Sequence, residues 1–157
     1  MFTPANHNKK GFTLIELLVV IAIIATLAVV AFVALDPVRR IRDAQNATRR
    51  TDVENISSAI ALQTIDDAGV LPAGLVADGL TYQIGTCASG AATLCPGAQG
   101  ACVDLSTVLA QKLSPIPTDP DSGTAATTGY SVSVDANNIV TVTSCGAEGV
   151  DPIFTSK

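Results

Sequence analysis

Residues 9–16 read Lys9-Lys10-Gly11-Phe12-Thr13-Leu14-Ile15-Glu16, and they join a short polar segment to a long apolar run. The run continues from Leu17 to Leu35 with 19 residues that carry no formal charge, and Thr26 is the only polar side chain among them. As a helix this run is about 29 Å long, which is enough to cross the hydrocarbon core of a bilayer. Glu16 therefore places one carboxylate just inside the end of a predicted membrane-spanning helix.

A secretory signal peptide and a plain membrane anchor are two simpler explanations of this apolar run, and neither accounts for all of its features. A secretory signal peptide has a shorter apolar region followed by a small-residue cleavage site, whereas this run ends in Leu35-Asp36-Pro37. A plain membrane anchor explains the length but not Glu16, because a carboxylate inside an apolar span is costly and usually marks a functional contact. The pattern favours a helix that is retained and whose carboxylate has a partner.

The segment from Lys9 to Ile24 resembles the processing and assembly signature of type IV prepilins and type II secretion pseudopilins, in the order Lys-Lys-Gly-Phe-Thr-Leu-Ile-Glu-Leu-Leu-Val-Val-Ile-Ala-Ile-Ile. In that family a membrane aspartyl peptidase cuts after the glycine, and the new N-terminal residue is methylated. The resemblance implies cleavage between Gly11 and Phe12, N-methylation of Phe12 and a role for Glu16 in assembly. It covers the N-terminal part of the chain closely, and farther on the segment Ile116–Pro120 is also similar to the family.

The chemistry of these residues agrees with that assignment. A small Gly11 suits a tight protease subsite, and Lys9 and Lys10 favour an anionic cytoplasmic leaflet. Glu16 gains a charged partner if a free α-amine lies beside it in a filament, and only cleavage creates that amine. A single-pass anchor with an incidental Glu16 is the alternative, and it does not explain the order of the motif.

We expect an α+β fold in which one long helix packs on a small antiparallel sheet, similar to pilins. The predicted parts are a leader that is removed (1–11), a transmembrane and assembly helix (12–35), an amphipathic half of the same helix (36–69), and a disulfide-stapled head with a C-terminal hairpin (70–157). A kink is predicted at Asp36-Pro37, because Pro37 lacks an amide hydrogen. Gly69 should end the helix.

The amphipathic half shows an apolar stripe at helical spacing, while its charged residues lie on other faces. The stripe consists of Val38, Ile41, Ala44, Ala47, Thr48, Val53, Ile56, Ala59, Ile60 and Ile65. The charged residues are Arg39, Arg40, Arg42, Arg49, Arg50, Asp52 and Glu54. We therefore expect the head to pack along the stripe.

In the head, alternating residues predict a strand over 80–84 and a hairpin formed by 130–134 and 139–143. The Gly-, Ala- and Ser-rich stretch 85–101 is expected to be a loop. Asp104 should cap a short helix that runs to Leu113.

Four cysteines, Cys87, Cys95, Cys102 and Cys145, predict two disulfides and an oxidising exterior. Zinc ligation is disfavoured, because the only histidine is His7 in the leader and paired C-x-x-C knuckles are absent from the sequence. Four reduced cysteines in a cytosolic protein are the alternative. Of the three possible pairings, proximity favours Cys87 with Cys95 and Cys102 with Cys145.

Charge is unevenly divided along the chain. Five of the nine basic residues lie between Arg39 and Arg50, and the chain beyond residue 50 has two lysines against eleven acids. Such an acidic head disfavours direct nucleic-acid binding. The arginines conflict with an exterior head under the positive-inside rule, but the cysteines and the leader motif outweigh that conflict.

Catalytic chemistry is not indicated. The histidine is lost with the leader, the sequence has no glycine-rich phosphate loop, and we predict neither an enzyme nor a bound cofactor. Asp119, Asp121 and Asp135 are weak candidates for calcium ligands, although Asp-Pro-Asp-Ser-Gly is also ordinary turn chemistry.

The resemblance implies a structural subunit of a type IV pilus-like filament. The alternatives are a pseudopilin of a type II secretion or DNA-uptake system and, third, a monomeric membrane-anchored binding module. The expected partners are a prepilin peptidase, other pilin subunits, the membrane and the assembly machinery. The precursor is expected in the cytoplasmic membrane with its head outside, and the assembled form in a surface or periplasmic filament.

Overall fold

The computed structural model describes residues 11–149 and 152–157, so the predictions for Lys9 and Lys10 lie outside the described residues. The elements are α1 (Leu14–Leu35), α2 (Pro37–Asp66), β1 (Thr81–Gln83), a 3-10 turn η1 (Ala91–Thr93), β2 (Tyr130–Val134), β3 (Val140–Ser144) and β4 (Phe154–Ser156). The chain forms two compact units, one ending at Arg40 and one beginning at Ile41.

Helix α1 is the apolar helix predicted from the sequence. It spans 22 residues, and none of them is buried within the part of the chain that the structure describes. The described residues contain one helical stretch that is long and apolar enough to cross a membrane, and α1 supplies its apolar part. Its apolar side chains are therefore available to lipid or to other protein chains.

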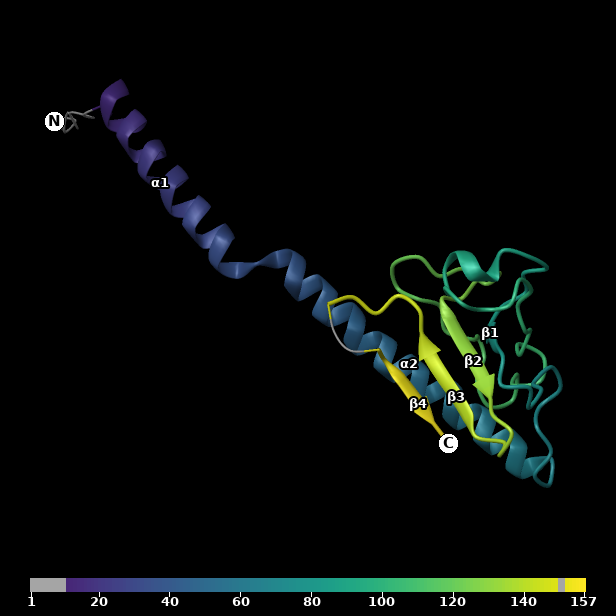
Figure 1. Ribbon diagram of the computed structural model, residues 1–157. Helices are drawn as coiled ribbons and strands as arrows, with labels where there is room; N and C mark the ends of the chain where they lie inside the picture. The colour runs from purple at the N-terminus through teal and green to yellow at the C-terminus, as the bar shows by residue number, and fades with distance from the viewer. Residues whose placement is uncertain (1–10, 150–151) are drawn as a thin grey trace, which may run out of the picture. The chain divides into compact units, whose positions relative to one another are not determined.

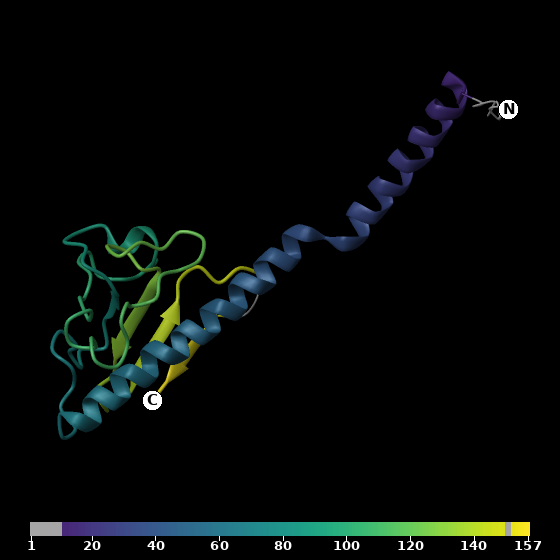
Figure 2. The ribbon, with the colours of Figure 1, turned by 180° about the vertical axis from the view of Figure 1, so that it is seen from behind.

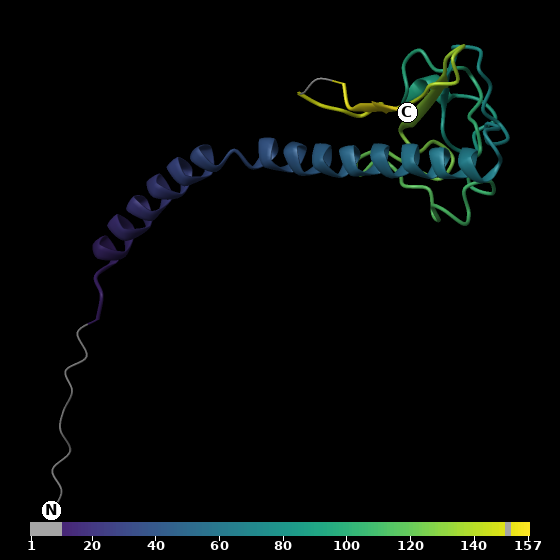
Figure 3. The same ribbon diagram turned by 90° about the horizontal axis from the view of Figure 1, so that it is seen from below.

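The predicted break at Asp36-Pro37 is confirmed. Asp36 adopts a left-handed conformation with φ 37° and ψ 68°, and the ribbon loses its helical coil between α1 and α2 (Figure 3). A residue before proline is disfavoured in the α region, whereas proline itself is well suited to the first position of a helix. The Asp36 side chain then accepts a hydrogen bond from the Arg39 amide at 3.3 Å.

The four strands form one antiparallel sheet in the order β1-β2-β3-β4. The predicted hairpin of β2 and β3 is confirmed, with Val134 opposite Val140 and Tyr130 opposite Ser144. Asp135 shapes its turn, because the carboxylate accepts hydrogen bonds from the amides of Asn137 and Ile139, both at 2.8 Å. The prediction that this hairpin ends the head is wrong, since β4 follows and pairs with β3.

Helix α2 packs across one face of this sheet (Figures 1 and 2). Val53, Ile56 and Ile60 are at most 1% exposed and belong to one core with the inward residues of β2 and β3, which include Val132, Val134 and Val142. The architecture is thus the predicted α+β, pilin-like arrangement of a long helix on a small antiparallel sheet.

The short helix predicted from Asp104 to Leu113 is not formed. Residues 106–112 form consecutive turns, although Asp104 does cap their start by accepting a hydrogen bond from the Ser106 amide. The segment contains Ser106, Thr107 and Val108, which favour a helix weakly, and burial of Leu105 and Leu109 holds it in place without a continuous helix.

The apolar stripe of α2 is also shorter than predicted. Of the predicted stripe, Val38, Ile41, Ala44, Ala47, Thr48 and Ile65 are exposed, whereas Asn46 and Arg49 are buried. Asn46 and Arg49 are buried because polar groups of the head cover them.

Candidate functional site

The N-terminal end of α1 carries the candidate site. Thr13 is the N-cap of the helix and forms a capping box with Glu16. Glu16 Oε2 accepts hydrogen bonds from the Thr13 amide at 2.8 Å and from Thr13 Oγ1 at 2.7 Å, and Thr13 Oγ1 accepts one from the Glu16 amide at 3.3 Å. This reciprocal pattern satisfies two amides that the first turn of a helix otherwise leaves without partners.

The capping box fixes the position of the Glu16 carboxylate but leaves some of its hydrogen-bond acceptor positions free. Only Oε2 takes part in these hydrogen bonds within the described chain, and an ionised carboxylate has about four acceptor positions on its two oxygens. Glu16 is also exposed, so a cation brought by another molecule can reach it.

Apolar side chains surround that carboxylate on one helix face. Phe12, Ile15, Glu16, Val19 and Val20 line a shallow depression, and Phe12 is 89% exposed. Residues three and four apart lie on the same side of a helix, so the depression follows one stripe of α1. This face combines one negative charge with a large apolar surface. It is suited to a partner that offers a cation beside apolar side chains.

Gly11 precedes this face and is not required by the fold that the structure describes. A Cβ atom added at Gly11 would meet no described atom within 4 Å, and its φ lies outside the region that favours glycine. Packing within the described residues therefore does not require a small residue at this position.

Sequence reasoning missed Thr13 as a partner of Glu16. The signal was present, because Thr13-Leu14-Ile15-Glu16 is a Ser/Thr-x-x-Glu pattern directly before an apolar run.

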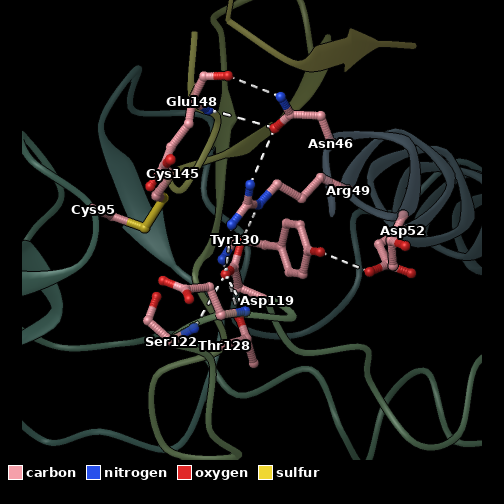
Figure 4. A network of polar contacts seen from close by, with 12 residues as sticks. Asn46, Arg49, Asp52, Cys95, Asp119, Ser122, Thr128, Tyr130, Cys145 and Glu148 are labelled. Carbon is pink, nitrogen blue, oxygen red and sulfur yellow. Dashed lines mark hydrogen bonds and ion pairs between the residues drawn. A yellow bond between two sulfur atoms is a disulfide. The ribbon is translucent and has the colours of Figure 1, made fainter. Parts of the chain in front are cut away.

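A second polar site lies between α2 and the head, and all its residues belong to the unit that begins at Ile41 (Figure 4). Arg49 and Asp119 form a buried ion pair with two hydrogen bonds, Nε to Oδ2 at 2.6 Å and Nη2 to Oδ1 at 3.1 Å. Asp119 Oδ1 also accepts from the amides of Asp121 at 3.0 Å and Ser122 at 3.3 Å.

The electrostatics of this pair follow from its burial and its partners. Burial alone raises the pKa of Asp119, but the hydrogen bonds from Arg49 and from the two amides hold that pKa below its ordinary value. The hydrogen bond to Asp119 in turn raises the pKa of Arg49. Both groups are therefore charged, and each depends on the other.

Neighbouring residues complete the link. Asn46 donates from Nδ2 to the carbonyl of Glu148 at 2.9 Å and accepts from Arg49 Nη1 at 3.1 Å. Tyr130 donates to Asp52 Oδ2 at 2.6 Å, and its burial together with that hydrogen bond raises the pKa of its hydroxyl. A polar strip thus fixes this part of α2 to the head where apolar contact was predicted.

Two of the three calcium candidates, Asp119 and Asp135, form hydrogen bonds within the protein. Asp119 binds Arg49, and Asp135 caps the hairpin turn. Within residues 11–149 and 152–157, Asp119, Asp121 and Asp135 are not brought together, and no group of three or more metal-ligating side chains forms.

The two predicted disulfides are confirmed, but the favoured pairing is wrong. Cys87 is joined to Cys102 and Cys95 to Cys145, each with a Cα–Cα distance of 5.0 Å. The chain after β1 runs beside residues 102–103, where Cys102 donates its amide to the carbonyl of Cys87 at 2.9 Å. Cys95 lies just after η1 and reaches Cys145 beyond the end of β3. Proximity in sequence therefore did not predict the pairs.

Comparison with known proteins gives one match. Residues 6–32 match the family model described as the prokaryotic N-terminal methylation motif. Searches of curated proteins and of solved structures find no match to the chain. The match covers the predicted processing segment and most of α1, so nothing beyond residue 32 contributes to it.

Proposed function

We propose that the chain is a type IV pilin-like structural subunit of a filament, because residues 6–32 match the N-terminal methylation motif and carry the type IV prepilin and pseudopilin signature. The precursor is anchored in the cytoplasmic membrane by α1, cut after Gly11 and methylated at Phe12. Mature subunits then leave the membrane and pack their α1 helices together.

The observation that carries this proposal is the contrast within α1. The helix exposes 22 residues that are almost entirely apolar, yet it holds one carboxylate in its first turn. Exposed apolar surface of this extent requires lipid or other protein chains around it. Lipid alone accounts for the apolar residues and leaves the carboxylate without a cationic partner.

Glu16 serves assembly in this proposal by pairing with the α-ammonium of Phe12 in a neighbouring subunit. Lipid tails are as apolar as the side chains of α1, so apolar contact alone discriminates poorly between one axial stagger of the helices and another. A charge pair inside a dry bundle penalises every stagger that leaves either charge unpaired. The carboxylate thus specifies the register of the subunits.

Mass spectrometry of the native protein tests the processing step. The mature chain should begin at Phe12 and carry one methyl group on its α-amine. Gly11→Val should leave the uncut precursor in the membrane, because a branched side chain would occupy the protease subsite next to the cut. Thr26→Val in the middle of α1 is the control and should be cut normally. A Gly11→Val protein that still began at Phe12 would contradict the proposal.

Electron microscopy of sheared cell-surface material tests the filament itself. Fibres that contain this chain support a pilus-like subunit. Short periplasmic assemblies without surface fibres would indicate the pseudopilin alternative, and a mature protein that never assembles would indicate a monomeric anchored module.

A further inference from the structure

Two arginines lie directly beyond the apolar helix. Arg40 donates from Nε to the carbonyl of Leu35, the last residue of α1, at 2.9 Å. The last four carbonyls of a helix have no partner within it, and α1 has no basic residue of its own in its last turn. Arg40 therefore satisfies one of these carbonyls and is held at the level where the apolar residues end.

Arg39 and Arg40 are unfavourably placed with respect to α2. They lie in its first turn, which contains no acidic residue, although the positive end of the helix dipole favours anions there. Asp36 offers one carboxylate, but its hydrogen bond goes to the Arg39 amide and not to the guanidinium. Within the described part of the chain, the Arg39 guanidinium is exposed and has no anionic partner. An external anion bound at these guanidinium groups would offset the repulsion between the arginines and the positive end of the helix dipole.

The length of α1 indicates where such an anion lies. Its 22 residues make a helix of about 33 Å, close to the roughly 30 Å of a bilayer core. When α1 spans the membrane, the Leu35 carbonyl lies at one edge of the hydrocarbon. The arginine stems then lie along apolar surface, and the guanidinium groups reach the layer of lipid phosphates.

We propose that Arg39 and Arg40 bind the phosphates of anionic phospholipids at the surface where α1 leaves the bilayer. The planar guanidinium matches two phosphate oxygens at once. Asp36, Arg39 and Arg40 together carry one excess positive charge, which favours anionic over zwitterionic headgroups. The inference rests on the membrane-spanning role of α1 in the proposed function, and it adds that departure into a filament must break these contacts.

The test uses the full-length protein in nanodiscs of phosphatidylcholine with phosphatidylglycerol. Solid-state NMR would measure dipolar coupling between arginine guanidinium ¹⁵N and lipid ³¹P, and the signals would be assigned with Arg39→Gln and Arg40→Gln. Both signals should show coupling. Arg50, which is also exposed and lies ten residues farther along α2, is the matched control and should show none.

Native mass spectrometry provides the second readout. Retention of phosphatidylglycerol should fall by about five-fold for each arginine replaced by glutamine, and Arg50→Gln should change nothing. Equal retention in the Arg39→Gln/Arg40→Gln double variant would overturn the inference. Coupling that persists in phospholipid-free detergent with inorganic phosphate would overturn it in favour of a free anion site.

Other outcomes separate this inference from the proposed function. A chain that failed to insert into nanodiscs would overturn both the spanning role of α1 and the lipid contact. Insertion without ¹⁵N–³¹P coupling would overturn the lipid contact alone. Cross-linking of these arginines to acidic residues of a second copy, with no coupling to lipid, would do the same and would assign the arginines to a subunit interface.

Discussion

Helices α1 and α2 follow one another with only Asp36 between them, and they are stabilised in opposite ways. In α1 the local sequence provides the cap, the apolar residues and the single charge, but none of its 22 residues is buried. In α2 the residues Val53, Ile56 and Ile60 complete a core with the sheet, and a buried ion pair adds a polar link. Helix α1 therefore needs lipid or other protein chains around its apolar residues, whereas the apolar residues of α2 pack against the sheet of the same chain.

This difference separates two kinds of function in one continuous region. Substitutions in α1 should change assembly and leave the stability of the head unaltered. Substitutions in the buried part of α2 should lower the stability of the head first.

Glu16→Val should lower the yield of sheared filament by roughly ten-fold or more, because the mature α-amine loses its partner. Membrane insertion and cleavage after Gly11 should continue, and thermal unfolding of the head should match wild type. Thr26→Val, another polar-to-apolar change in α1, should leave the yield unchanged. Normal filament yield from Glu16→Val would show that the carboxylate does not set the register.

Arg49→Met should lower the free energy of unfolding by about 3–5 kcal/mol, because it leaves Asp119 buried without its partner. The same substitution at Arg42 is the control. Arg42 pairs with Glu148 at 3.0 Å, but both side chains are about half exposed, so Arg42→Met should cost at most about 1 kcal/mol. Urea denaturation of the two variants measures the difference. Equal losses would show that the buried pair contributes no more to the free energy of unfolding than the exposed pair does.

Removing the Cys87–Cys102 disulfide with paired Cys87→Ser and Cys102→Ser changes should lower stability by about 3 kcal/mol in the chain-entropy model. Removal of Cys95–Cys145 should cost about 1 kcal/mol more, because its loop spans 50 residues and the other spans 15. Denaturation of the two double variants gives both values. The yield of membrane-inserted protein should not change, and a loss of insertion would break the division between α1 and the head.

The smallest predicted effect is a dependence on pH. Since the pKa of Asp119 is lowered in the folded protein, its ion pair contributes full stability above the ordinary aspartate pKa of about 3.9. That contribution should disappear as the pH falls through the lowered folded pKa. Asp119→Asn should flatten this part of the stability curve, and an unchanged acid slope would contradict the assignment.

The sequence predicted those features that depend on neighbouring residues. The order Gly11, Phe12 and Glu16 before an apolar run indicated the N-terminal motif that residues 6–32 match, and alternation predicted the hairpin of β2 and β3. Pro37 predicted the break between the helices. In each case the physical cause lies within a few residues of the observation.

Features that depend on distant partners were predicted poorly. Arg49 was predicted to lie on a face other than the apolar stripe, because charges in an amphipathic helix usually lie away from the core, whereas its partner Asp119 lies 70 residues away. The Cys87–Cys102 pair depends on residues 102–103 running beside the end of β1, which no local pattern encodes. Strand β4 was missed because Phe154–Ser156 is too short to show alternation.

The disulfide pairing also determines the order in which the two bonds form during maturation of the chain. Their pairs interleave, since Cys95 lies between Cys87 and Cys102, while its own partner Cys145 comes last. In the proposed function the leader stays on the cytoplasmic side and the head follows α1 across the membrane in sequence order, so Cys87 and Cys95 meet an oxidant before either native partner does. Oxidation at that stage joins Cys87 to Cys95. Attack of the Cys102 thiolate on Cys87 then forms the native Cys87–Cys102 disulfide and frees Cys95, which is oxidised together with Cys145 when that last cysteine arrives. The Cys95–Cys145 disulfide is thus the last to form, and an isomerase that catalyses the exchange would speed maturation of the head.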